Sequence, residues 1–163
     1  MKGILVIGLY NSGKTSIIRK LKTGKFSEDS LPTLGYSIDV FTNKGKDLQF
    51  FDIGGAGSYR DFANVFLPLV NNVILVVDVS ESSHYGEARE YLRSLIEQKE
   101  LDKLSTAIFA NKIDQLEDFS EDELLSYLEL GKDNHRIKIF KTSAKTGEGI
   151  QEGIDWLIKG EIE

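Results

Sequence analysis

Hydrophobic residues along this chain gather in short continuous runs, separated by segments in which they recur at helical spacing. A short apolar run that ends at glycine or at polar residues is typical of a strand buried on both faces. Ile4–Ile7 and Val73–Val77 are runs of this kind, and two more strands are predicted at Thr106–Ala110 and Ile137–Phe140.

Helices are predicted between these strands. They cover Lys14–Lys22, Ser83–Gln98, a segment that starts after Ser120, and a last segment containing Ile150, Ile154 and Leu157. Ser120 is followed three residues later by Glu123, which is the capping-box pattern of a helix N-terminus.

A hairpin is predicted around Asn43–Lys46, with strands over Tyr36–Phe41 and Asp47–Ile53. Strands that alternate with helices favour a mostly parallel sheet with helices on both faces. We therefore expect an α/β fold with three layers, six strands and one antiparallel edge strand. The 163 residues suit one domain spanning 1–163.

Composition excludes several kinds of protein. The net charge of −6 argues against a nucleic-acid partner, since nucleic-acid-binding domains are usually basic. The absence of cysteine excludes disulfides, thiolate zinc sites, thiol catalysis, and prenyl or palmitoyl anchors. No apolar stretch approaches the ~20 residues of a membrane span. With Lys2 in second position, the chain as given also lacks a myristoylation signal. We expect a cytoplasmic monomer without a direct membrane anchor.

The segment GLYNSGKT, Gly8–Thr15, fits the phosphate-loop pattern G-x-x-x-x-G-K-[ST] between a predicted strand and a predicted helix. Glycines let successive backbone N–H groups turn toward phosphate oxygens, and the helix N-terminus adds positive potential. Lys14 reaches the β- and γ-phosphates, and the Thr15 hydroxyl is a Mg²⁺ ligand. The expected nucleotide contacts here are Asn11, Ser12, Gly13, Lys14, Thr15 and Ser16.

Two further motifs follow later strands and predict a guanine pocket. In Asn111-Lys112-Ile113-Asp114, the Asp114 carboxylate suits the guanine N1–H and 2-amino donors, which adenine lacks. In Thr142–Lys145, the backbone N–H of Ala144 suits guanine O6. Ligands bind at the carboxyl edge of parallel sheets, where both motifs are expected. The expected base contacts are Asn111, Lys112, Asp114, Ser143, Ala144 and Lys145.

In this order, GLYNSGKT, Pro32-Thr33, DIGG, NKID and TSAK resemble the motifs of the small GTPases of the Ras superfamily, which are P-loop NTPases. Pro32–Tyr36, Asp52–Gly55 and Gly147–Gly149 with the later Trp156 are most similar to the Arf/Arl branch. TSAK is instead the Ras or Rab form. The resemblance covers essentially the whole chain.

The resemblance implies a molecular switch that cycles between GTP and GDP. Thr33 corresponds to a threonine that joins Thr15 and Asp52 around Mg²⁺, and Gly55 to a glycine whose N–H contacts the γ-phosphate. Lys14, Thr33 and Gly55 are therefore the expected catalytic residues. Hydrolysis is expected to release two loops, roughly Phe26–Tyr36 and Gly54–Pro68.

The resemblance also implies effector, exchange-factor and GTPase-activating partners, which act in trafficking or signalling. Three aromatic residues at Tyr36, Phe51 and Phe66 match positions that form an effector patch in Arf proteins. Core packing of the same rings remains an equal alternative at this stage.

Two residues depart from the family pattern. Ala56 replaces the glutamine that orients the attacking water, which predicts slow intrinsic hydrolysis and an activating partner. Tyr10 stands in the phosphate loop near the γ-phosphate. Its ring folds outward, or blocks the site, or its hydroxyl takes a catalytic part. Tyr59 and Arg60 are other nearby polar candidates, although Arg60 matches an arginine that is not catalytic in Arf proteins.

These departures leave two functional hypotheses open. The first is a GTP switch with weak hydrolysis, completed by a partner. The second is a hydrolysis-defective, GTP-bound scaffold or adaptor. The first strand also begins almost at Met1, which leaves no room in this sequence for the amphipathic helix that precedes it in Arf proteins.

Overall fold

The computed structural model describes residues 1–97, 103–130 and 136–160. Its centre is a six-stranded sheet in the order β2-β3-β1-β4-β5-β6, in which β2 is antiparallel to β3 and the other neighbouring pairs are parallel. The strands are β1 (Lys2–Gly8), β2 (Tyr36–Asn43), β3 (Lys46–Ile53), β4 (Asn72–Asp78), β5 (Ser105–Asn111) and β6 (Ile137–Lys141).

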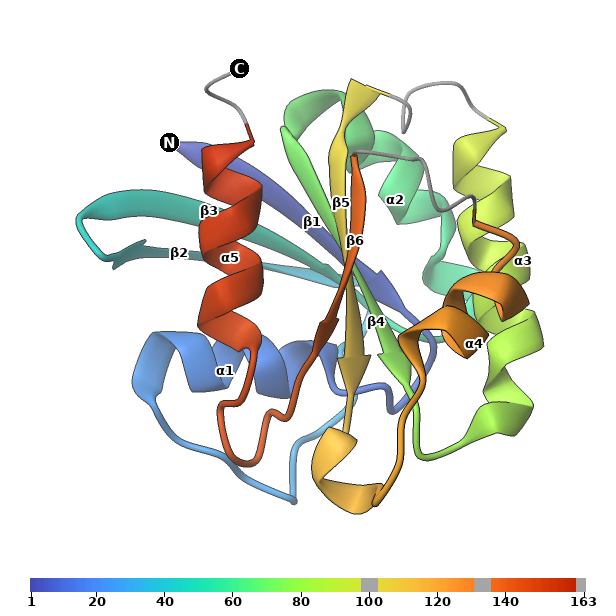
Figure 1. The fold of residues 1–163 in the computed structure, drawn as a ribbon. Coiled ribbons are helices and arrows are strands. Elements are labelled where there is room, and N and C mark those ends of the chain that lie inside the picture. The colour runs from blue at the N-terminus through green and yellow to red at the C-terminus, as the bar shows by residue number, and fades with distance from the viewer. Residues whose placement is uncertain (98–102, 131–135, 161–163) are drawn as a thin grey trace.

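Helices cover both faces of this sheet (Figure 1). Two of them, α1 and α5, pack on one face, whereas α2, α3 and α4 pack on the other. The helices are α1 (Lys14–Thr23), α2 (Asp61–Phe66), α3 (Tyr85–Ile96), α4 (Glu121–Tyr127) and α5 (Ile150–Lys159). The predicted three-layer α/β fold with one antiparallel edge strand is confirmed.

The central strand β1 shows why continuous apolar runs predicted buried strands. Ile4 and Val6 belong to the core under α1 and α5, whereas Leu5 and Ile7 belong to the core under α2 and α3. All four side chains are fully buried. Because successive side chains in a strand point to opposite faces, a strand between two helical layers must be apolar throughout.

The hairpin between β2 and β3 closes through a two-residue turn. Asn43 pairs with Lys46, and the two residues between them, Lys44 and Gly45, have φ of 48° and 77°. Positive φ at both central residues matches the right-handed twist of the flanking strands. The turn therefore lies where the sequence predicted it.

The predicted elements agree with the structure to within a few residues at their ends. Ser120 caps α4, since its Oγ accepts a hydrogen bond from the Glu123 backbone N–H at 3.2 Å. The sequence did not predict α2, which lies in the segment expected to be a loop. The helix predicted at Ser83–Gln98 corresponds to α3, and its predicted last residue, Gln98, lies outside the described residues.

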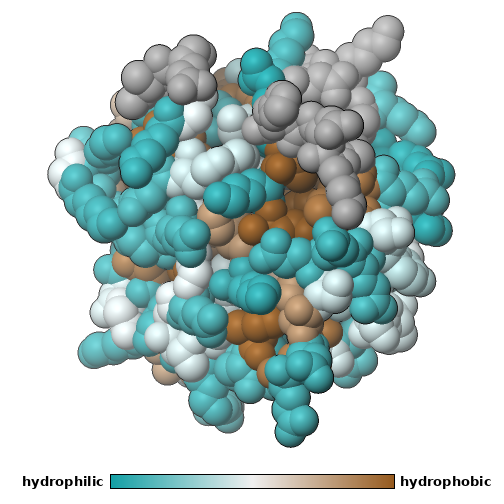
Figure 2. Space-filling view, viewed as in Figure 1, coloured by the Kyte–Doolittle hydropathy of each residue, from teal (hydrophilic) through white to brown (hydrophobic). Residues whose placement is uncertain are grey.

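From the β6 side, most of the visible surface is hydrophilic, and hydrophobic side chains show mainly in the middle of the view (Figure 2). Among the helices of the described segments, none has the length and apolar character needed to cross a bilayer.

Candidate functional site

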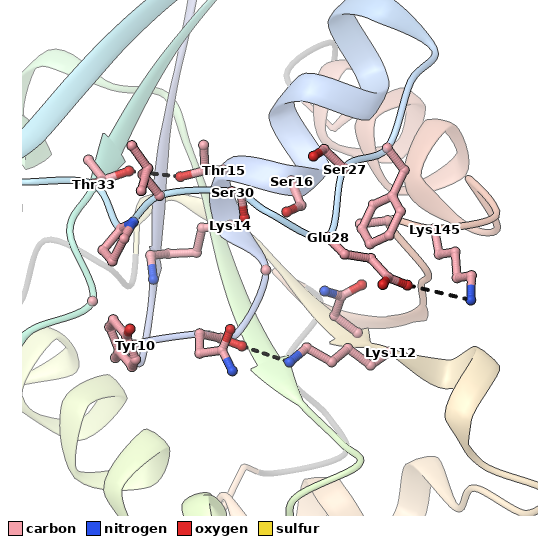
Figure 3. Close-up of a pocket in the computed structure, with 18 of the residues that line it drawn as sticks. Tyr10, Lys14, Thr15, Ser16, Ser27, Glu28, Ser30, Thr33, Lys112 and Lys145 are labelled. Carbon is pink, nitrogen blue, oxygen red and sulfur yellow. Dashed lines mark hydrogen bonds and ion pairs between the residues drawn. The ribbon is translucent and has the colours of Figure 1, made fainter.

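A cavity of about 540 Å³ lies at the carboxyl ends of the parallel strands, between the loops that follow β1, β3, β5 and β6. This volume lies within the range of roughly 300–1,000 Å³ typical of small-molecule sites. Figure 3 shows Thr15 and Thr33 on one side of the cavity, and Lys112 and Lys145 on the other. Most of the expected nucleotide contacts line it: Asn11, Gly13, Lys14, Thr15, Ser16, Thr33, Gly55, Asn111, Lys112, Asp114, Ala144 and Lys145.

The loop Gly8–Thr15 curls tightly before α1. Gly13 has φ 100°, and a Cβ there would lie 2.3 Å from Nδ2 of Asn111. The Asn111 amide donates a hydrogen bond to the Ser12 carbonyl at 2.9 Å, so the first base-pocket residue also holds the phosphate loop. Ser12 itself is buried and does not line the cavity.

Lys14 is a buried cation at the base of the loop. Its Nζ donates to the Leu9 carbonyl at 2.9 Å, and only 6% of the residue is exposed. Burial lowers the pKa of Lys14 to about 8, and the Asp52 carboxylate partly opposes this change. A desolvated ammonium at the N-terminus of a helix suits an anionic ligand.

Three side chains that carry oxygen atoms, those of Thr15, Thr33 and Asp52, converge close to Lys14. Thr15 Oγ1 donates to Asp52 Oδ2 at 2.5 Å, Thr33 Oγ1 lies 2.8 Å from Thr15 Oγ1, and Thr33 also donates to Asp52 Oδ2 at 3.3 Å. Burial raises the pKa of Asp52, opposed by the hydrogen bond from Thr15. The second Asp52 oxygen, Oδ1, is buried and has no hydrogen-bond partner among the described residues.

This donor set fits Mg²⁺. The ion prefers oxygen ligands and usually takes one or two carboxylates together with substrate phosphates and waters. Among the described residues, no group of three or more His, Cys, Asp or Glu side chains is arranged to hold a metal ion by itself, so this part of the chain offers no all-carboxylate cage. When bound, Mg²⁺ would supply positive charge against the β- and γ-phosphate oxygens.

At the far end of the cavity, Asp114 is held by Ser143. Ser143 Oγ donates to Asp114 Oδ1 at 2.7 Å and accepts a hydrogen bond from the Thr146 backbone N–H at 3.1 Å. Ser143 is fully buried and does not line the cavity. Ser143 was expected to contact the nucleotide. In the structure, its side chain lies behind Asp114.

The two lysines of the base motifs have different surroundings. Lys112 Nζ lies 2.8 Å from both the Asn11 carbonyl and Asp78 Oδ2, so its stem lies along the cavity wall in a fixed position. Lys145 is more exposed, and its Nζ lies 3.9 Å from Glu28 (Figure 3). Glu28 belongs to a group of lining residues that no sequence motif indicated: Phe26, Ser27, Glu28, Ser30, Leu31 and Gln115. Pro32 and Leu34, from the Pro32–Tyr36 motif, and Tyr59, a polar candidate named from sequence, also line the cavity.

The two loops expected to be released on hydrolysis, Phe26–Tyr36 and Gly54–Pro68, are called the switch segments below. They approach each other and the phosphate loop closely at glycine residues. The Gly54 N–H donates to the Gly35 carbonyl at 2.8 Å. A Cβ on Gly54 would lie 2.5 Å from the Thr33 carbonyl, and one on Gly55 would lie 2.4 Å from the Tyr10 nitrogen. Both positions therefore need glycine for close approach of the backbones.

The two residues that depart from the family pattern lie at the phosphate-loop end of the cavity. Ala56 and Tyr10 both line the cavity, and Tyr10 is 61% exposed. Within the described residues, the Tyr10 side chain has neither a hydrogen bond nor an aromatic contact. The ring thus borders the cavity but lies largely in solvent.

The three aromatic residues expected to form a patch are in mutual contact but differ in exposure. The Phe66 ring lies 4.9 Å from the Tyr36 ring and 4.8 Å from the Phe51 ring, centre to centre. Only Tyr36 is exposed, whereas Phe51 and Phe66 are buried in the core under α2. Core packing thus holds for Phe51 and Phe66, and the effector patch stays a prediction in which Tyr36 is the exposed member.

A sequence model of the ADP-ribosylation factor family matches residues 1–160. ADP-ribosylation factor 1 of Brassica rapa subsp. pekinensis is 37% identical over 159 residues, which cover 94% of this chain and 85% of that protein. ADP-ribosylation factor-like protein 1 of Caenorhabditis elegans is 34% identical over 157 residues, covering 94% and 86%. Among solved structures, the Arl6 BBS3 small GTPase from Trypanosoma brucei with bound nucleotide analogue GppNp gives a TM-score of 0.88 at 26% identity, over 98% of this chain and 96% of that one.

Proposed function

Since the chain belongs to the ADP-ribosylation factor family of GTP-binding switch proteins, we propose that it hydrolyses GTP slowly and depends on an activating partner for faster turnover. Residues 1–163 act as one nucleotide-binding domain in this proposal. Members of the family bind GTP and GDP, typically with Mg²⁺, and contact effectors, exchange factors and activating proteins.

The observation that supports this proposal best is the meeting of Thr15, Thr33 and Asp52 within 2.5–3.3 Å of one another, beside a cavity with Asp114 at its other end. Thr33 belongs to the segment before β2 and Asp52 to β3. Their contact lets a γ-phosphate and Mg²⁺ hold both segments at once, which is how nucleotide state would reach a partner.

The residues have the following proposed roles. Lys14 neutralises the β- and γ-phosphates, Gly55 donates its N–H to the γ-phosphate, and Thr33 joins Thr15 and Asp52 as a Mg²⁺ ligand. Asp114 selects guanine, held in place by Ser143, and Ala144 meets guanine O6. Asn11, Gly13, Ser16, Lys112 and Lys145 complete the walls, while Ser12 and Asn111 support the loop from behind.

Partners are proposed to bind on the β2–α2 side. Exposed apolar side chains occur on both of these elements: Tyr36, Ile38 and Val40 on β2, Val65 on α2, and Leu69 just after it. Solvent-exposed apolar groups of this kind mark protein-binding surfaces. An activating protein would supply a water-orienting group opposite Ala56, and effectors would act in trafficking or signalling.

The base assignment is tested by titrating the purified chain with fluorescent GTP and ATP analogues in Mg²⁺. We expect GTP to bind at least ~100-fold more tightly, since adenine offers no donors to the Asp114 carboxylate in place of the guanine N1–H and 2-amino group. Asp114→Asn should remove most of this preference. A variant that prefers GTP as strongly as wild type would refute the role of Asp114.

The hydrolysis assignment is tested by single-turnover GTP hydrolysis of wild type and Ala56→Gln. We expect a measurable but slow rate in wild type and a rate at least ~10-fold higher in Ala56→Gln. A wild-type protein that binds GTP but never hydrolyses it, even with an activating protein, would instead favour a GTP-bound scaffold.

A further inference from the structure

Two neighbouring side chains after the Asp52–Gly55 motif point in opposite directions. Arg60 turns toward α3, where Nη2 donates to Glu87 at 2.6 Å and the guanidinium lies 4.9 Å from the centre of the Tyr91 ring. Tyr59 instead lines the nucleotide cavity. Arg60 thus does not line the nucleotide cavity, whereas Tyr59 does.

The Tyr59 ring packs at the point where the two switch segments meet. A Cβ placed on Gly54 would lie 2.6 Å from Tyr59 Cδ2 and 2.5 Å from the Thr33 carbonyl, so ring and carbonyl border the same point. The centre of the Phe62 ring lies 6.4 Å from that of Tyr59. Packing fixes this ring, but its hydroxyl makes no hydrogen bond within the described part of the chain.

Few polar side chains from the switch segment Gly54–Pro68 reach the cavity. Of its described residues between 54 and 68, Gly55, Ala56 and Tyr59 line the cavity. Gly55 has no side chain and Ala56 carries a methyl group, so Tyr59 brings the one polar side-chain atom among these three. A group that orients water must be held in place before the reaction, and Tyr59 meets that condition.

We propose that the Tyr59 hydroxyl orients the attacking water in place of the missing glutamine, and that Arg60 is a positioning residue that fixes it by its contacts with α3. This inference rests on the proposed GTPase function. A phenol accepts one hydrogen bond from water and donates another to a γ-phosphate oxygen. The water oxygen bonds to the γ-phosphorus. The bond from that phosphorus to the β–γ bridging oxygen breaks, and its electron pair leaves with GDP. The water protons pass to the released phosphate and to solvent, and Tyr59 ends the step unchanged.

Tyr10, in the phosphate loop, is the competing phenol, since it also lines the cavity (Figure 3). Its side chain lies largely in solvent, and no hydrogen bond or aromatic contact holds it among the described residues. A mobile group must be ordered during the reaction, whereas a packed one need not be. The geometry therefore favours Tyr59.

The test compares single-turnover GTP hydrolysis and GTP affinity in wild type, Tyr59→Phe and Tyr127→Phe. Tyr127 is an exposed tyrosine on α4 that does not line the cavity, so it controls for loss of a phenol. We expect Tyr59→Phe to hydrolyse GTP at least ~10-fold more slowly while its GTP Kd stays within ~2-fold of wild type. Tyr127→Phe should match wild type in both.

A Tyr59→Phe rate within ~2-fold of wild type overturns the inference and leaves the proposed GTPase function intact. Failure of wild type to bind GTP refutes the proposed function itself. A wild type that binds GTP without hydrolysing it overturns the inference, but leaves GTP binding standing.

The role of Arg60 is tested by Arg60→Met and by the double variant with Tyr59→Phe. If Arg60 acts through Tyr59, Arg60→Met slows hydrolysis, and the double variant is no slower than Tyr59→Phe alone. Rates that multiply in the double variant would overturn the positioning role, because a general structural defect adds to any other loss.

Discussion

Gly55 and Gly57 lie two residues apart, yet their surroundings predict opposite responses to substitution. A Cβ on Gly55 would lie 2.4 Å from both N and Cα of Tyr10, which are backbone atoms with no room to move. Nothing lies within 4 Å of a Cβ on Gly57. We expect Gly55→Ala to weaken GTP binding by at least ~10-fold, about 1.4 kcal/mol, while Gly57→Ala binds GTP as wild type does.

Gly57→Ala should also be no less stable, because alanine restricts the unfolded chain more than glycine does. Titration with a fluorescent GTP analogue and thermal unfolding measure both effects. Equal GTP affinities in the two variants would show that the phosphate loop can shift to accept the added methyl group.

Single residues of the site could be predicted from sequence where a motif fixes the backbone around a ligand. Lys14, Thr15 and Asp114 line the cavity as the motifs indicated. Ser143 was assigned to the nucleotide but lies behind Asp114, since a motif gives the position of a residue and not the direction of its side chain. Tyr59 was only one of several candidates, because a sequence does not give the direction of its side chain, and only the folded structure shows that it lines the cavity.

At the scale of elements, the tip of the β2–β3 hairpin is fastened to α5. Asn43 and Gln151 exchange two amide hydrogen bonds of 3.1 and 2.8 Å, and Lys44 Nζ donates to Asp155 Oδ2 at 2.7 Å. Gln151 also donates to Asp155 at 2.9 Å. The hairpin joins the segment of Thr33 to that of Asp52, so these contacts support the position of both.

The contact between Lys44 and Asp155 predicts a pH-dependent contribution to stability. The hydrogen bond from Lys44, helped by Gln151, lowers the pKa of Asp155 below its ordinary value of 3.8. A lowered folded-state pKa contributes stability that is present above the unfolded pKa and is lost as pH falls through the folded one. Because the pair is partly exposed, we expect Asp155→Asn to cost about 0.3–1 kcal/mol at pH 7.

Urea unfolding of wild type and Asp155→Asn between pH 7 and pH 2 measures this contribution. The difference in unfolding free energy should shrink once the pH falls below 3.8, the ordinary pKa of the carboxyl group. Glu152→Gln, on the same helix, serves as the matched control for the loss of one carboxylate. A constant difference at all pH values would mean that Asp155 acts by packing instead of charge.

The elements could be predicted where their periodicity was long enough to read. The buried strands and the helices α1, α3, α4 and α5 follow from apolar runs, helical spacing or a cap. The six residues of α2 make less than two turns, and only Ala63 and Phe66 are buried, so no periodic signal exists. The fastening of Asn43 to Gln151 spans 108 positions and depends on folded geometry, which no local pattern records.

At the scale of the whole molecule, the parallel sheet explains why distant motifs form one site. β1, β5 and β6 run in the same direction, so the loops after them meet at one edge. The phosphate loop and the two base motifs follow these strands, and their joint placement could be predicted from sequence alone. The segment Phe26–Tyr36 has no periodic signal, and its closure over Thr15 depends on the tertiary contact between Thr33 and Asp52.

That closure makes stability depend on which nucleotide is bound. A ligand that binds only the folded state adds RT ln(1 + [L]/Kd), about 4 kcal/mol at 1,000 times Kd. GTP with Mg²⁺ would engage Thr33 through the γ-phosphate and Mg²⁺, whereas GDP lacks the phosphate that holds this segment. We therefore expect thermal unfolding to shift further with GTP and Mg²⁺ than with GDP and Mg²⁺ at equal free nucleotide concentrations, because contacts to the segment before β2 would lower the Kd of GTP.

Thr33→Ala should reduce the shift with GTP to that with GDP, while Thr42→Ala, in the hairpin, should keep the difference. Limited proteolysis between Phe26 and Tyr36 gives an independent measure, since a held segment resists cleavage. Equal shifts for both nucleotides in wild type would mean that Thr33 stays on Asp52 whichever nucleotide is bound. The switch would then have to lie in the segment that contains Tyr59 and Arg60.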